Sequence, residues 1–113
     1  MAMLRALFVG LPALIFALGV PLALRLVPPN RFFGFRTSTT FSSLDAWYQI
    51  NYATGLAMMA AGVAGGLFAL VLSYGVTWLK PEARYLTGVL LTALVMAAFF
   101  IPVVIYSAKF GSD

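Results

Sequence analysis

Cysteine and histidine are both missing from this sequence of 113 residues, and charged residues make up only 9% of it. Without them the chain can form no disulfide, thiolate nucleophile or histidine proton relay, and it lacks the usual ligands of zinc and haem. Negative charge is limited to Asp45, Glu82 and Asp113. We predict Asp45 and Glu82 on opposite sides of a membrane, which argues against the carboxylate pair of a hydrolase. We therefore expect no enzyme, no metal site and no cofactor.

Apolar residues dominate what remains, at 63% of the chain with a mean hydropathy of +1.01. A helix needs roughly 20 mostly apolar residues to cross about 30 Å of hydrocarbon. Three stretches meet this length, at about residues 3–27, 43–76 and 81–108. The sequence predicts an all-α integral membrane protein: one three-helix domain over residues 1–113, with three transmembrane helices and an ordered interfacial loop between the first two. The net charge of +4 comes from isolated basic residues, which favours contact with membrane lipid over binding of nucleic acid.

Prolines and hydroxyl side chains mark the predicted helix ends. Pro28 and Pro29 end the first helix, because proline cannot donate to the backbone ladder and disfavours helical geometry in the residue before it. The segment 42–45 is typical of a helix start, with serine as the cap and an acidic residue in the first turn. Pro81 suits the first position of the third helix. Bends are expected at the prolines inside the helices, which are Pro12, Pro21 and Pro102.

The connection over residues 28–42 is the unusual part of the chain. It combines four phenylalanines, two arginines and a row of hydroxyl side chains. Aromatic rings suit the headgroup level of a bilayer, Gly34 permits a left-handed backbone, and hydroxyls can satisfy backbone groups that lack a partner. These features predict an ordered loop at the membrane interface.

Arg36 and Asn51 are the leading candidates for a site. A guanidinium group pairs with carboxylates, carbonyls and phosphates, whereas an unpaired amide in hydrocarbon costs several kcal/mol. We expect Asn51 and the loop around Arg36 to bond each other. This contact could be a structural clasp. It could instead form a ligand pocket in which Asn51 and the threonines orient Arg36, with Trp47 and Phe35 as aromatic walls. Arg36 and Arg31 could also simply anchor the loop to lipid phosphate.

Small residues form a stripe on the second predicted helix, and such surfaces let helix backbones approach closely. The packing candidates are Gly55, Gly62 and Gly66. Three helices bury little surface alone, so we expect a homo-oligomer. A small transport or channel subunit is an alternative, in which the glycine stripe and the prolines line a path between protomers.

The loop and the start of the second helix resemble the SdpI family of bacterial membrane proteins, named for immunity to a sporulation-delaying peptide toxin. An asparagine precedes a Gly-Phe-Arg-Thr core, a threonine follows, and a tryptophan and an asparagine lie one turn apart. The matching residues are Asn30, Gly34, Phe35, Arg36, Thr37, Thr40, Phe41, Trp47, Asn51 and Gly55. The resemblance implies a three-helix module with this loop as its signature, and it implies immunity to, or sensing of, a peptide toxin.

We therefore expect a non-enzymatic protein of the bacterial inner membrane that binds a peptide toxin, a lipid or a membrane or cytoplasmic protein partner through the loop and the second helix. A structural membrane scaffold is a further alternative. The basic residues near the helix ends divide almost evenly between the two sides. We place the loop and the C-terminus in the cytoplasm.

Overall fold

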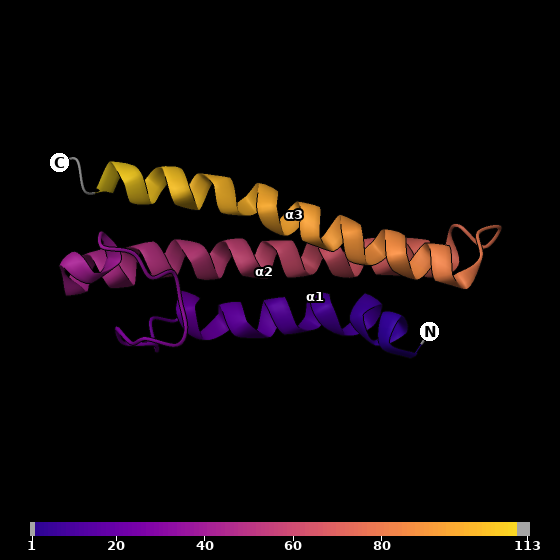
Figure 1. The fold of residues 1–113 in the computed structure, drawn as a ribbon, viewed down its shortest axis with the longest axis horizontal. Helices are drawn as coiled ribbons and strands as arrows, with labels where there is room; N and C mark the ends of the chain where they lie inside the picture. Colours follow the sequence, from indigo (N-terminus) through magenta and orange to yellow (C-terminus); the bar gives the residue numbers. More distant parts are fainter. Residues whose placement is uncertain (1, 111–113) are drawn as a thin grey trace.

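The structure, a computed structural model, describes residues 2–110 and consists of three long helices and one short helical turn (Figure 1). Helix α1 covers Ala2–Ala23, α2 covers Leu44–Tyr74 and α3 covers Pro81–Phe110, and the 3-10 turn η1 covers Thr40–Ser42. All three helices are long and apolar enough to cross a membrane. The predicted all-α fold class is confirmed: the chain is a multi-pass membrane protein. The predicted polar tail, residues 111–113, lies outside the described residues.

Helix α2 packs against both α1 and α3, which also contact each other. The loop and the end of α3 share one end of the bundle (Figure 1). With 31 residues, α2 is about 46 Å long at about 1.5 Å per residue. This exceeds the roughly 30 Å of hydrocarbon that a spanning helix must cross. The helix is therefore longer than a span requires, and its first turns lie beside the loop.

Helix α1 ends at Ala23, short of the predicted end at Val27, because the chain turns into a left-handed cap. Arg25 has φ +60°. The Arg25 amide donates to the Leu22 carbonyl (3.2 Å), and the Leu26 amide donates to the Pro21 carbonyl (2.9 Å). These two bonds form a Schellman motif, a common helix terminator. The loop therefore starts before the two prolines that the sequence suggested as the stop.

Helix α2 starts one residue after Ser43, whose hydroxyl oxygen accepts a hydrogen bond from the Ala46 amide (3.0 Å). Asp45 lies in the first turn, where a carboxylate complements the positive end of the helix dipole. Helix α3 starts at Pro81. Helices α1 and α3 continue through their internal prolines.

Glycines allow α1 and α2 to pack backbone against backbone. A Cβ on Gly55 would meet the backbone of Gly19 and Ala23, and one on Gly62 would lie 2.8 Å from the Pro12 carbonyl oxygen. The third predicted packing glycine behaves differently: Gly66 is exposed, and a Cβ there would meet nothing within 4 Å. Gly66 lines an open groove between α1 and α2, so the two helices make no close contact at this glycine.

Candidate functional site

The loop between α1 and α2 is held in shape by two local turns of hydrogen bonds. The Asn30 side-chain oxygen accepts from the amides of Phe32 (2.8 Å) and Phe33 (2.7 Å), and its side-chain nitrogen donates to the Pro28 carbonyl (2.7 Å). This is an Asx-type turn, in which a side chain takes the place of a backbone partner. The turn over residues 28–33 is thereby held by a side chain of the loop itself.

Thr37 and Thr40 form the second turn. The Thr37 amide donates to the Thr40 hydroxyl oxygen (2.8 Å), and the Thr40 amide donates to the Thr37 hydroxyl oxygen (3.2 Å). The Thr40 hydroxyl donates in turn to the Thr37 carbonyl (2.9 Å), and Thr40 is fully buried. This reciprocal pairing has the pattern of a capping box. It explains why the loop runs into η1 at this point.

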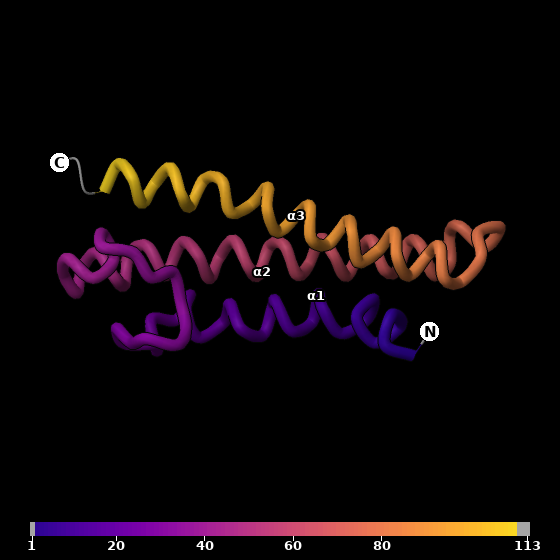
Figure 2. Tube along the Cα trace, in the orientation of Figure 1, coloured from indigo at the N-terminus to yellow at the C-terminus, as the bar shows by residue number. Residues whose placement is uncertain are grey.

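Figure 2 shows the chain between α1 and α2 passing beside the start of α2. Two side chains on successive turns of α2 tie this loop to the helix. The Trp47 indole nitrogen donates to the Val27 carbonyl at 2.7 Å. The Asn51 side-chain oxygen accepts from the Phe35 amide at 2.6 Å, and its nitrogen donates to the carbonyls of Phe35 (3.3 Å) and Trp47 (3.0 Å). Trp47 is fully buried and Asn51 is 2% exposed. We call these contacts to Val27 and Phe35 the clasp.

Gly34 lets the loop approach the clasp. Its φ is +110°, a backbone conformation that residues with a side chain rarely adopt. A Cβ at this position would lie 2.8 Å from the Asn51 side-chain oxygen and 3.3 Å from the Trp47 ring. The glycine is therefore required for two separate reasons, its backbone angle and the closeness of α2.

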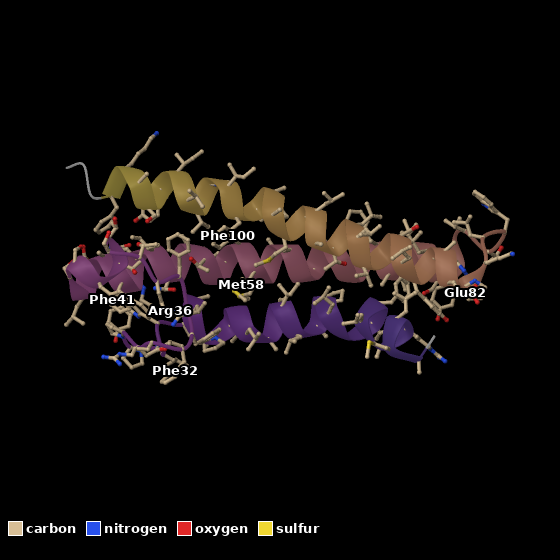
Figure 3. The ribbon with its side chains drawn as sticks, viewed as in Figure 1. Phe32, Arg36, Phe41, Met58, Glu82 and Phe100 are labelled. Carbon is tan, nitrogen blue, oxygen red and sulfur yellow. The ribbon has the colours of Figure 1, made fainter. Side chains whose placement is uncertain are left out.

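Helix α3 closes the site from the other side. The rings of Phe35 and Phe100 lie 5.3 Å apart at 56°, a tilted aromatic contact. Below the loop lies a cavity of about 490 Å³, and Arg36, Thr54, Met58 and Phe100 are among its lining residues. Figure 3 shows Arg36 on the loop and Met58 and Phe100 on α2 and α3, toward the same end of the bundle. All three helices therefore contribute to this cavity, since Leu22 of α1 lines it as well.

Arg36 is the one polar residue of the loop that lines this cavity. It is exposed and lines the cavity, and within residues 2–110 its guanidinium makes neither a hydrogen bond nor an ion pair. Asn51 and the threonines make no direct bond to the guanidinium: Asn51 bonds the backbone of Phe35, and the threonines bond each other. The hydrogen bonds that hold the loop come from Asn30, Thr37, Thr40, Trp47 and Asn51, so none of them uses the guanidinium.

The other predicted site residues divide by role. Asn30, Gly34, Thr37, Thr40, Trp47 and Asn51 all shape or hold the loop, and Phe35 connects it to both α2 and α3. Sequence reasoning missed Thr54, Met58 and Phe100 as cavity residues. These side chains look like ordinary residues of spanning helices, and nothing in their spacing links them to the loop.

The fold and the loop together define a class of protein: a membrane protein with three spanning helices and an ordered loop bonded to the second. The model of the SdpI/YfhL protein family matches residues 26–107, which include the loop, α2 and most of α3. The chain therefore belongs to this family, as the resemblance of its loop predicted. Comparisons with curated proteins and with solved structures gave no match.

Proposed function

We propose that this protein is a non-enzymatic immunity or sensing protein of the bacterial inner membrane, and that it recognises a peptide toxin at the loop end of the bundle. Arg36 carries the proposal, because it is the loop's one polar side chain that is exposed at a cavity and makes no hydrogen bond within residues 2–110. A guanidinium in this position is suited to a carboxylate or backbone carbonyl of a peptide. The rings of Phe32, Phe33 and Phe35 beside it supply apolar contact.

Charge at the loop end supports the same partner. Arg25, Arg31 and Arg36 lie in or beside the loop and Lys109 in the last turn of α3, whereas Asp45 is the single acidic residue at this end among residues 2–110. An acidic group is therefore attracted to this end and a basic one repelled. We propose that the loop and the C-terminus face the cytoplasm and that the protein works as a homo-oligomer.

The transport alternative receives less support from the packing. A path along the glycine stripe needs these glycines to face open space, but Gly55 and Gly62 are buried against α1. Pro12, one of the expected bend positions, is buried against the same stripe. Gly55 and Gly62 join two helices of one chain, and Gly66 alone of the three is exposed, so we propose no second function.

The experiment is a survival assay in sensitive bacteria that express the protein and are challenged with a sporulation-delaying peptide toxin. Arg36→Ala and Arg36→Lys should lose most of the protection at unchanged membrane abundance, because lysine cannot reproduce the planar fork of the guanidinium. Arg31→Ala is the matched control, an exposed arginine of the same loop that does not line the cavity. Equal protection by the wild type and both Arg36 variants would refute the proposal, as would an absence of protection by the wild type.

A further inference from the structure

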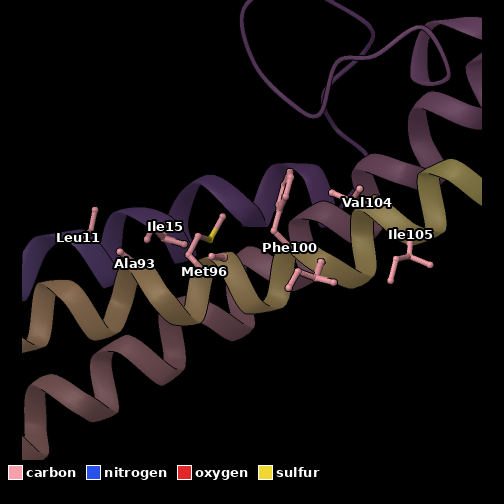
Figure 4. A pocket seen from close by; sticks show the side chains of 9 residues that line it. Leu11, Ile15, Ala93, Met96, Phe100, Val104 and Ile105 are labelled. Carbon is pink, nitrogen blue, oxygen red and sulfur yellow. The ribbon is translucent and has the colours of Figure 1, made fainter.

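A second, apolar groove runs between α1 and α3. It has a volume of about 630 Å³, within the range of small-molecule sites. Leu11 and Ile15 line it from α1, and side chains between Ala93 and Ile105 line it from α3 (Figure 4). Every lining residue is apolar. The groove is therefore suited to a hydrocarbon chain.

The length of the groove restricts its occupant. Ala93 and Ile105 are twelve residues apart on one helix, which corresponds to about 18 Å at about 1.5 Å per residue. This is a little more than half of the roughly 30 Å hydrocarbon core, so the groove is about as deep as one leaflet. Because α3 ends at Phe110 beside the loop, this leaflet is the one on the loop side. A membrane-spanning peptide helix would need a longer face.

The groove adjoins the cavity that Arg36 lines. Phe100 lines both spaces, so the two adjoin at its ring. A guanidinium with no bond among residues 2–110 thus lines a cavity that adjoins an apolar groove about one leaflet deep. The surrounding excess of basic residues favours a negatively charged head over a zwitterionic one.

We propose that this end of the bundle binds one anionic phospholipid, with its phosphate on Arg36 and one acyl chain in the groove between α1 and α3. The lipid comes from the loop-side leaflet and needs no peptide, so this inference does not rest on the proposed immunity function. A lipid held here is more than an annular neighbour, because its head and its chain each have a site.

The test is native mass spectrometry of the detergent-purified protein with added phosphatidylglycerol or phosphatidylcholine of identical acyl chains. One phosphatidylglycerol adduct should persist at collision energies that remove phosphatidylcholine. Arg36→Gln should reduce the occupancy of this adduct at least fivefold, whereas Arg31→Gln, in the same loop, should reduce it less than twofold. Equal losses in the two variants, or equal retention of the two lipids, would overturn the proposal.

The acyl chain is tested separately. Ala97→Phe should fill the groove and reduce the adduct while leaving Arg36 in place, and Ala97→Leu provides a smaller change if the phenylalanine variant does not fold. Glycerol 1-phosphate, which carries the head without the chain, should not compete with the lipid. Undiminished lipid binding in the folded groove variant, or full competition by glycerol 1-phosphate, would contradict a bound chain. Neither measurement involves a peptide toxin, so failure here and failure of the immunity proposal are distinguishable.

Discussion

Replacing Asn51 by leucine is the most direct test of the clasp. The change keeps a side chain of similar size but removes the acceptor of the 2.6 Å bond from the Phe35 amide and the donor to the Phe35 carbonyl. Each bond contributes about 0.5–1.5 kcal/mol, and a partly buried amide left without a partner costs about 1–3 kcal/mol. Because Asn51 is 2% exposed, water cannot readily replace it. We expect the docked loop to lose about 2–3 kcal/mol.

Hydrogen exchange of the loop amides measures this loss. Since about 1.4 kcal/mol is a factor of ten, peptides covering residues 28–42 should exchange roughly 30- to 150-fold faster in the variant when exchange follows loop opening. Thr92→Val is the matched control. It also removes a buried side-chain bond, from the Thr92 hydroxyl to the Gly88 carbonyl (2.9 Å), but on α3 and away from the loop. Unchanged loop exchange in Asn51→Leu, or an equal increase in the control, would refute the clasp.

Three further predictions concern single contacts and can be checked by thermal unfolding in detergent. Gly34→Ala should destabilise the protein by about 1–3 kcal/mol, since φ is +110° there; an unchanged midpoint would contradict the strained geometry. Trp47→Phe keeps an aromatic ring but loses the 2.7 Å bond to the Val27 carbonyl, so a loss of about 1 kcal/mol is expected, and wild-type stability would argue against that bond. Gly55→Leu should separate α1 from α2 and cost at least about 1–3 kcal/mol, whereas Gly66→Leu should be neutral because a Cβ there meets nothing. Equal effects of the two leucines would show that the packing face is misassigned.

The predictable part of the fold came from features that act locally. The length of an apolar segment predicts a spanning helix whatever the rest of the fold, because backbone groups in hydrocarbon find hydrogen-bond partners only within their own helix. Pro81 and the serines before α2 were recognisable as helix starts for the same reason: a cap depends on a few neighbouring residues. The end of α1 was harder, because Arg25 adopts a left-handed cap that sequence normally signals with glycine.

The site was only partly predictable. The composition of the loop and the buried amide of Asn51 indicated that the two should bond, since a lone amide in a spanning helix is costly. The partner atom was not predictable: Asn51 bonds the backbone of Phe35 rather than any side chain. Nearly every residue carries the same backbone amide and carbonyl. The residue types of the loop therefore do not indicate which backbone group the Asn51 side chain will bond.

The sequence by itself therefore determined that this chain has three helices long and apolar enough to cross a membrane, and that residues 28–42 resemble the loop of the SdpI/YfhL family. Tertiary structure alone decided which polar groups the loop satisfies internally and that Arg36 is left over at a cavity. It also placed the ring of Phe100 against the ring of Phe35, 65 residues away along the chain, where both line this cavity. Whether a segment can span a membrane depends on the summed hydrophobicity of its own residues. Whether a guanidinium is left without a bond depends on every group that the fold brings near it.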